Sequence, residues 1–364
     1  MPLPVTPGND AIAFFSDDYM SARTGLLAAA HTCAHLADSH SVVLQAPGEP
    51  GVSLTSELLW LGSTQAQKVL VLSSATHGVE GFVGAALQRD LLLRLQQSYR
   101  LPEDTAVLLV FALNPWGFYR QRRCDEQGID LNRNFIDFSQ PLPANPGYES
   151  LQTAIYLEDS AQRQRLFDDF RLQHGQNEFE FAISGGQYSD PQGPFYGGHQ
   201  PAHGRRVIES TIERYQLAQR HLAVVDIHSG LGLYAHGEII NDHPPGTSGF
   251  DIANRWYGAS VTAPAMGTSS SVMKLGLMDY RWHELMSERG CFVTLEFGSY
   301  NTEALFEVVL QDHRCWKSGD AQAIARAAHE MREHFCPRDN YWRELVLVKS
   351  RQVIQQALDG LQYG

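Results

Sequence analysis

Three apolar, β-rich runs in this chain each lead into polar residues that can carry out chemistry. They are Val69–Leu72 before His77 and Glu80, Leu222–Val225 before Asp226 and His228, and Cys291–Leu295 before Glu296. Apolar runs of this length are typical of buried strands, and open α/β sheets bind their ligands at the carboxyl ends of their strands. The sequence therefore predicts a sheet that gathers imidazole and carboxylate groups along one edge.

Helical segments alternate with these strands along the chain. Strands are expected at 41–44, 58–61, 68–74, 105–113 and 233–240, and in the runs that end at His228 and Glu296. Helices are expected at 11–36, 81–97, 148–174, 205–219 and 250–257, and largely helical sequence runs from about residue 302 to the end. This alternation predicts an α/β three-layer sandwich around a mixed, mostly parallel central sheet. Because no shift in composition marks a boundary, we expect residues 1–364 to form a single domain.

The charge, apolar runs and cysteine content of the chain indicate which partners and which compartment to expect. The 364 residues carry a formal net charge of −13, which argues against nucleic acid or an anionic membrane, because both attract clustered Lys and Arg. No apolar run approaches the about 18–20 residues that span a bilayer, and the first residues lack the segments of a secretory signal. The five cysteines form no C-x-x-C pair, which fits a reducing compartment. We therefore expect a cytoplasmic protein, and the oligomeric state stays open.

The polar residues at the predicted sheet edge have the composition of a catalytic zinc site. Such a site usually takes three protein ligands from His, Asp or Glu and leaves a fourth position for water. His77 and Glu80 can converge where a strand passes into a helix, with Gly78 permitting a tight turn. An H-x-x-E pair on its own is more often a structural hydrogen bond than a metal site. The expected strand-end placement of His77, Glu80 and His228, together with Asn132-Arg133 between them, reverses that judgement and predicts a site for one Zn²⁺ ion.

The motifs together resemble those of the zinc carboxypeptidase superfamily. They are His77-x-x-Glu80, Arg123 ahead of Asp130-Leu131-Asn132-Arg133-Asn134-Phe135, Asp226-Ile227-His228-Ser229 and Thr294-Leu295-Glu296. The strings Thr76–Phe82, Gly186-Gln187-Tyr188 and Phe195–Gly198 resemble one bacterial branch of that superfamily. The similarity runs from about Phe14 to beyond Glu296. It implies a zinc-carboxypeptidase-like fold.

The resemblance also implies roles for the residues in these motifs. His77, Glu80 and His228 would hold the zinc ion. Glu296 would be the general base that takes a proton from zinc-activated water and passes it to the leaving amine.

The same resemblance assigns the cationic residues to the substrate. Arg123 would stabilise the negative oxygen of the reaction intermediate, although its assignment rests on its distance from Asn132, so Arg120 and Arg122 stay open. Asn132 and Arg133 would bind a substrate carboxylate, because an Arg fork matches a carboxylate in bidentate fashion.

On this basis we expect a hydrolase that cleaves an amide or peptide bond next to a carboxylate-bearing residue. A deacylase of small N-acyl amino acids on the same zinc core is the second hypothesis, and the glycine-rich stretch 184–198 is typical of a loop that caps such a pocket. A binding protein that keeps the fold without activity is the third. The presence of both Glu296 and Arg123 weighs against it, because binding alone requires neither. The substrate would be a peptide or an N-acyl amino acid.

Other residues near these motifs have no single assignment. Tyr280 and Tyr300 are both candidates for the mobile tyrosine that superfamily peptidases often place over the substrate. Asp226 precedes His228 by two residues, so both side chains face the same side of a regular strand, and Asp226 either supports the ligand or serves a structural role. His199-Gln200-Pro201-Ala202-His203 has helical metal spacing, but Pro201 works against the helix that the spacing needs.

Overall fold

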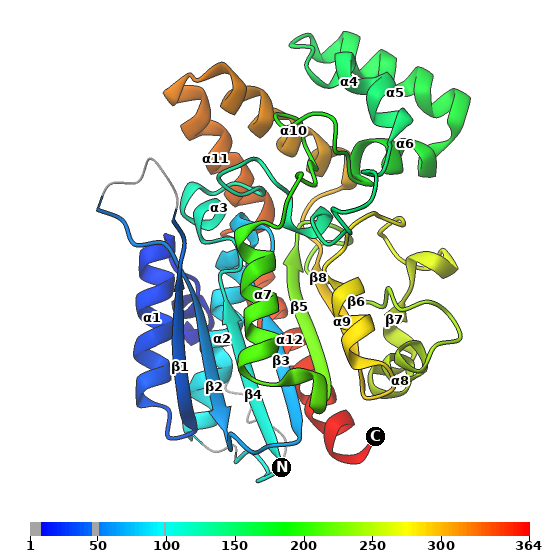
Figure 1. Cartoon of the computed structure of the whole chain (residues 1–364). Helices are drawn as coiled ribbons and strands as arrows, with labels where there is room; N and C mark the ends of the chain where they lie inside the picture. Colours follow the sequence, from blue (N-terminus) through cyan, green and yellow to red (C-terminus); the bar gives the residue numbers. More distant parts are fainter. Residues whose placement is uncertain (1–8, 46–50, 98–99) are drawn as a thin grey trace.

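A central eight-stranded sheet organises the chain (Figure 1). The structure is a computed structural model that describes residues 9–45, 51–97 and 100–364. The N-terminal stretch in which we saw no secretory signal lies largely outside these described residues. The strands are β1 (Leu36–Val43), β2 (Thr55–Gly62), β3 (Lys68–Ser73), β4 (Thr105–Phe111), β5 (His221–Ser229), β6 (Gly237–Ile240), β7 (Val261–Thr262) and β8 (Gly290–Phe297).

The order of the strands is β1-β2-β4-β3-β5-β8-β6-β7. The four central strands β4, β3, β5 and β8 run parallel, while β1, β2 and β6 pair antiparallel with their inner neighbours. Strand β4 is buried along its whole length, as expected for a parallel strand that is covered on both faces. The predicted α/β sandwich with a mixed, mostly parallel sheet is therefore confirmed.

Helices cover both faces of the sheet and one of its ends. They are α1 (Tyr19–Thr32), α2 (Gly81–Gln97), α3 (Pro115–Arg120), α4 (Pro146–Ile155), α5 (Ser160–His174), α6 (Gln176–Ser184), α7 (His203–Arg214), α8 (Ser248–Tyr257), α9 (Asp279–Met286), α10 (Thr302–Ser318), α11 (Ala321–Phe335) and α12 (Asn340–Tyr363). One apolar core joins α1, α2, α8 and α12 to one face, and a second joins α7 and α9 to the other. A third core packs α4–α6 with α10 and α11, which gather beyond one end of the sheet (Figure 1).

Two long helices expected from the sequence are interrupted in the structure. The 11–36 segment breaks at Asp18, whose side chain accepts a hydrogen bond from Ser21 N at 2.7 Å and caps α1. The 148–174 segment breaks after Ile155, and Asp159 caps α5 by accepting from Gln162 N at 3.0 Å. The expected helix 81–97 is confirmed as α2. Among the described residues, every helix is too short or too polar to cross a bilayer.

Candidate active site

His77 and Glu80 are placed by a tight turn between β3 and α2. His77 precedes a single 3₁₀ turn, Gly78–Glu80, and α2 begins at the next residue. The Gly78 amide donates to the Arg123 carbonyl at 3.1 Å, which fixes the turn against the segment after α3. A Cβ atom at Gly78 would lie 2.1 Å from the carbonyl carbon of Gly117, so only glycine fits there. The turn therefore aims both side chains at the carboxyl edge of the sheet.

His228 and Glu296 reach the same edge from adjacent strands. In the parallel β3/β5 pair, Ser73 lies opposite Asp226, so His228 stands two residues beyond the end of β3. In the β5/β8 pair, His228 lies opposite Glu296. Sheet register therefore brings residues that are distant in the sequence into one cluster.

The donor atoms of His77, Glu80 and His228 converge, and all three side chains are buried. His77 Nδ1 lies 2.8 Å from Glu80 Oε1, and His228 Nδ1 lies 3.0 Å from Glu80 Oε2. One donor atom from each residue can be chosen so that all lie within 4.8 Å of one another. A tetrahedral zinc site with bonds of roughly 2.0–2.1 Å has donor atoms about 3.4 Å apart. The arrangement and the chemistry of these donors both suit a zinc ion.

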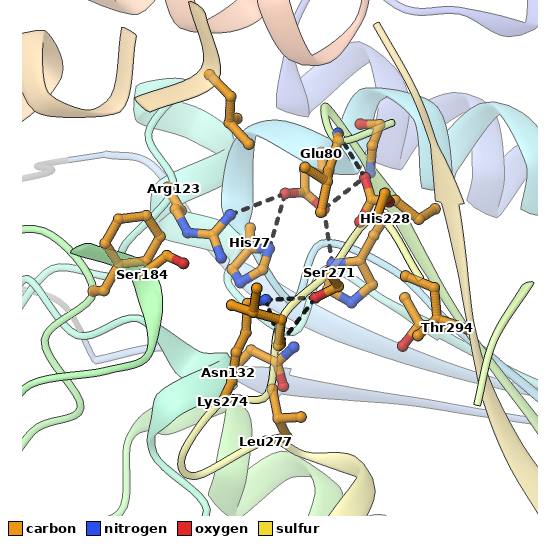
Figure 2. Close-up of a pocket in the computed structure, with 18 of the residues that line it drawn as sticks. His77, Glu80, Arg123, Asn132, Ser184, His228, Ser271, Lys274, Leu277 and Thr294 are labelled. Atoms are coloured by element: carbon orange, nitrogen blue, oxygen red, sulfur yellow. Dashed lines mark hydrogen bonds and ion pairs between the residues drawn. The ribbon is translucent and has the colours of Figure 1, made fainter. Parts of the chain in front are cut away.

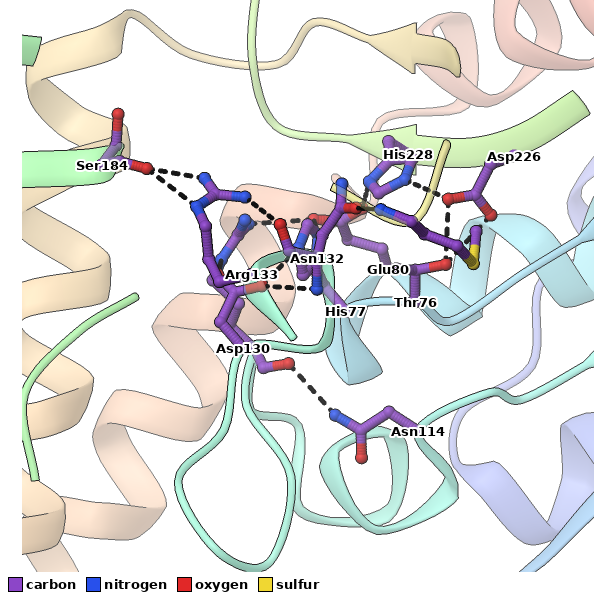
Figure 3. A network of polar contacts seen from close by, with 12 residues as sticks. Thr76, His77, Glu80, Asn114, Asp130, Asn132, Arg133, Ser184, Asp226 and His228 are labelled. Atoms are coloured by element: carbon purple, nitrogen blue, oxygen red, sulfur yellow. Dashed lines mark hydrogen bonds and ion pairs between the residues drawn. The ribbon is translucent and has the colours of Figure 1, made fainter. Parts of the chain in front are cut away.

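Each imidazole is held from behind by a carboxylate (Figure 3). His77 Nε2 lies 3.1 Å from Asp130 Oδ1, and His228 Nε2 lies 2.5 Å from Asp226 Oδ2. The carboxylates keep the proton of each neutral ring on Nε2, which leaves the Nδ1 lone pair free to face Glu80. Metal-binding histidines almost always have such a partner. The arrangement thus has the supporting groups of a metal site as well as its ligands.

Charges within the cluster shift the pKa values of its members. Burial alone would raise the pKa of Glu80, but the charges and hydrogen bonds of His77 and His228 outweigh it and hold the pKa well below its usual value. Burial opposes protonation of His228, yet Asp226 and Glu80 raise its pKa well above the usual value. The carboxylates around the two imidazoles therefore favour positive charge at this position.

Glu296 lies in the same cavity but is bonded differently from Glu80. Its Oε1 accepts a hydrogen bond from the Leu231 amide at 3.1 Å, and no other hydrogen bond reaches its carboxylate from the described residues. Burial, followed by the negative charge of Glu80, raises the pKa of Glu296 to about 8. One carboxylate oxygen is thus left to exchange a proton with a group in the cavity.

Of the three arginines between which the sequence did not decide, Arg123 is the one that lines the cavity (Figure 2). Its Nε donates to Asp130 Oδ2 at 2.9 Å, and its Nη1 lies 3.4 Å from Glu80 Oε1. Arg122 instead forms a bidentate pair with Asp312, away from the cavity. Arg120 is exposed at the end of α3.

Asn132 and Arg133 form another wall of the cavity. Arg133 is fully buried, and its Nε and Nη2 donate to the Ser184 carbonyl at 3.0 and 2.6 Å. Its Nη1 donates to the Asn132 carbonyl at 2.5 Å. Asn132 Oδ1 accepts from the Met278 amide at 2.8 Å, which leaves its amide nitrogen for a ligand. Two of the five guanidinium N–H groups of Arg133 are not used by these bonds.

The remaining sequence candidates lie away from this cavity. Among the described residues that line it, neither Tyr280 nor Tyr300 is found. Tyr280 donates its hydroxyl to the Lys274 carbonyl at 2.7 Å, and Tyr300 is 42% exposed. His203 is buried against Ser56, 3.2 Å from its hydroxyl, while His199 is exposed.

Sequence reasoning missed several residues of the site. Asp130 was read only as part of a motif, although its place two residues before Asn132 was a usable signal. Lys274 and Asp242 also line the cavity. Asp242 follows the end of β6 by two residues, which was a usable signal, whereas Lys274 comes from a loop without a strand-end pattern. The cavity has a volume of about 90 Å³ and lies directly beside the cluster.

Solved structures with a similar fold are carboxypeptidase-like. Bovine thrombin-activatable fibrinolysis inhibitor, solved in complex with tick carboxypeptidase inhibitor, is 12% identical with a TM-score of 0.50, and the match covers 94% of this chain and 99% of that one. A metallo-carboxypeptidase from Pseudomonas aeruginosa is 14% identical with a TM-score of 0.43, covering 90% and 68%. An aspartoacylase family protein from Mesorhizobium loti is 13% identical with a TM-score of 0.38, covering 76% and 65%. The chain therefore has the carboxypeptidase fold, and the resemblance predicted from its motifs is confirmed.

A family model also matches most of this chain. A family model described as "Protein of unknown function (DUF2817)" matches residues 15–349, and the chain belongs to that family. A search of curated proteins finds no significant match to the sequence.

Proposed function

We propose that this protein is a zinc-dependent hydrolase that cleaves an amide or peptide bond next to a carboxylate-bearing residue. The observation that carries the proposal is the meeting of two imidazoles and a carboxylate, each imidazole backed by a further carboxylate, beside Glu296 and Arg123. His77, Glu80 and His228 would hold the metal. A zinc ion there would polarise the substrate carbonyl and make water a better nucleophile at neutral pH.

Glu296 would act as the proton carrier of the reaction. Its Oε1 is engaged by the Leu231 amide, so Oε2 is the atom that would take a proton from the attacking water and deliver it to the leaving nitrogen. Proton transfer by a positioned carboxylate contributes about 10²–10⁴-fold in rate.

The cationic residues would bind and orient the substrate. Arg123 lies beside Glu80, where its guanidinium would stabilise the negative oxygen that develops on the attacked carbonyl. The unused N–H groups of Arg133 and the side-chain amide of Asn132 would bind the substrate carboxylate. This contact fixes the scissile bond relative to Glu296 and lowers the entropy cost of reaction.

The test is a screen of N-acyl amino acids and short peptides with the zinc-loaded protein. We expect turnover that falls by about 10²–10⁴-fold in Glu296→Gln, while the zinc content of the variant stays at the wild-type level. Glu213→Gln, an exposed substitution on α7, is the matched control and should keep full activity. Equal turnover in Glu296→Gln, or none by the wild type in the presence of bound zinc, would refute the proposal.

A deacylase of small N-acyl amino acids is the second candidate. Ser184 and Phe195, from the glycine-rich stretch 184–198, form part of the cavity lining, and a loop that encloses the substrate suits a small molecule. Comparing N-acetyl amino acids with tripeptides that end in the same residue separates the two reactions. A deacylase prefers the acetyl compounds, whereas a peptidase prefers the longer chains.

A further inference from the structure

Lys274 is a cation in the cavity for which the proposed hydrolysis has no role. Its ammonium donates to the Ser271 hydroxyl at 2.5 Å and to the Val272 carbonyl at 3.0 Å. Figure 2 shows Lys274 beside Asn132, with its side chain reaching Ser271 below His77. Among the residues that the structure describes, no Asp or Glu forms an ion pair with it. An amine this close to the substrate-binding residues, bonded only to neutral groups, is positioned to bind an anion.

The loop that carries Lys274 is held firmly on both sides. The Lys274 carbonyl accepts from Tyr280, and the Leu275 amide donates to the Gly185 carbonyl at 2.8 Å. The Phe135 amide donates to the Gly276 carbonyl at 3.1 Å. These bonds tie the loop to the segments around Arg133 and Ser184, so the position of the amine is a fixed feature of the cavity.

A buried carboxylate anchors the preceding part of this loop. Glu238 on β6 accepts from the hydroxyls of Thr262 and Ser269 at 2.5 and 2.8 Å, and from the Ser270 amide at 3.1 Å. Its charge is therefore compensated by the loop and does not neutralise Lys274. The fold thus supports the lysine through neutral groups, and no ion pair among the described residues neutralises its charge.

Arg133 is a second cation in the same wall without an ion pair. Its guanidinium bonds only to the carbonyls of Ser184 and Asn132. Burial, and next the positive charge of Arg133, lower the pKa of Lys274 to about 7. Two like charges in a partly dehydrated cavity repel each other, and an anion placed between them removes that cost.

We propose that Lys274 and Arg133 together select substrates that carry two negative groups, one next to the scissile amide and a second on the side chain. Acidic residues such as aspartate or glutamate have this chemistry. This inference rests on the proposed function, because it assumes that Arg133 faces the substrate. It adds a substrate class and a specificity-determining residue to that function.

Asp242 also lines this cavity, and its carboxylate would favour a cationic substrate side chain over an anionic one. None of the hydrogen bonds among the described residues involves this carboxylate. Burial raises the pKa of Asp242 to about 6, and Lys274 and Arg133 partly offset that rise. Asp279 also lines the cavity, and burial and the charge of Asp242 raise its pKa well above the usual value, so it carries little negative charge. Lys274 and Arg133 together outweigh the remaining charge of Asp242, so this wall favours an anionic side chain over a cationic one.

Binding of small acids tests the subsite without requiring turnover. Calorimetry would measure glutarate and butyrate binding to the zinc-loaded wild type, to Lys274→Met and to Lys349→Met. Lys349 lies on α12, outside the cavity lining, and is the matched control. Both acids offer one carboxylate to Arg133, so the difference between their affinities reports the contribution of the second carboxylate. We expect glutarate to bind at least about 10-fold more tightly than butyrate, with this advantage lost only in Lys274→Met.

Hydrolysis provides a second, separable measurement. N-acetyl-glutamate, N-acetyl-glutamine and N-acetyl-lysine would be compared on wild type and Lys274→Met. We expect kcat/KM to favour glutamate over glutamine by about 10-fold or more, and the variant to lose this preference. A glutarate advantage that depends on Lys274 without any hydrolysis would refute the proposed function and keep the subsite. Hydrolysis without glutamate preference, a preference for lysine, or an unchanged preference in Lys274→Met would refute the subsite alone.

Discussion

Asp226 connects the sheet to the predicted metal ligand His228, and its replacement by Asn isolates the contribution of its charge. The carboxylate receives His228 Nε2 at 2.5 Å, the Ser73 hydroxyl at 2.6 Å and the Thr76 hydroxyl at 2.9 Å. Asn keeps the shape of Asp but carries no charge. The hydroxyls of Ser73 and Thr76 can rotate to accept from the new amide group. We therefore expect Asp226→Asn to stay folded.

The cost of this substitution should appear in metal affinity. If the Asn oxygen faces His228, the ring keeps its orientation but loses the charged partner that strengthens its Nδ1 as a ligand. If the Asn nitrogen faces His228, the imidazole proton moves to Nδ1, the atom that faces Glu80. Removal of such a supporting group costs typically 10–100-fold in metal affinity, equal to about 1.4–2.7 kcal/mol.

Competition with a chromophoric chelator would measure the zinc Kd, and circular dichroism would check the fold. Asp190→Asn is the matched control, because Asp190 is also a buried carboxylate that accepts three side-chain hydrogen bonds, from Tyr148, Gln152 and Tyr156. It lies outside the lining of the cavity and should leave the Kd unchanged. A folded Asp226→Asn that binds zinc with wild-type affinity would show that our reading of the cluster is wrong.

Two further predictions concern stability. Burial lowers the pKa of His283 to about 3, and His243 stacks on it with 3.6 Å between the ring centroids. The unfolded state therefore binds a proton more readily than the folded state. The resulting contribution to folding stability is present above pH 6.5 and is lost as the pH falls. Between pH 7 and 4.5, urea unfolding should therefore show a loss of stability about 2–3 kcal/mol larger in wild type than in His283→Phe. Equal losses in the two proteins would contradict this prediction. Arg122 is buried and donates to both oxygens of Asp312, from Nε to Oδ1 at 3.1 Å and from Nη2 to Oδ2 at 2.8 Å. Asp312→Ala leaves this charge without its partner and should cost about 3–5 kcal/mol in the same assay. The double variant Arg122→Met/Asp312→Leu should recover most of that loss, and no recovery would argue against an uncompensated charge as its cause.

The strands that build the site could be predicted because a strand buried on both faces requires a continuous run of apolar residues. β3, β5 and β8 are covered on both faces, so each reads as an apolar run that ends where a polar residue is needed. His228 and Glu296 stand out for that reason. Their alignment in register on neighbouring strands then follows from the topology.

Helix boundaries were harder to predict, because apolar spacing can continue across a break. Residues on both sides of Asp18 have helical spacing, yet the capping bond of Asp18 starts α1 only at Tyr19. Asp159 has the same effect before α5. Both caps are local signals in the sequence. Asp is a preferred N-cap residue, so Asp18 and Asp159 are each candidate helix starts.

Lys274 could not have been placed from the sequence. Its loop has no periodic pattern, and its position depends on bonds to Gly185, Phe135 and Glu238, which are distant in the chain. Such contacts exist only after the sheet and its surrounding segments have assembled. The candidate metal ligands and Arg133 were thus visible in the sequence, whereas Lys274, on which the proposed substrate preference also depends, was not.

The most direct test of the account is an anomalous-scattering map at the zinc edge from crystals of the zinc-loaded protein. We predict one strong peak, bonded at roughly 2.0–2.2 Å to Nδ1 of His77, Nδ1 of His228 and the carboxylate of Glu80. A zinc peak bound by other residues, or no peak near these three side chains in crystals that contain zinc, would contradict it.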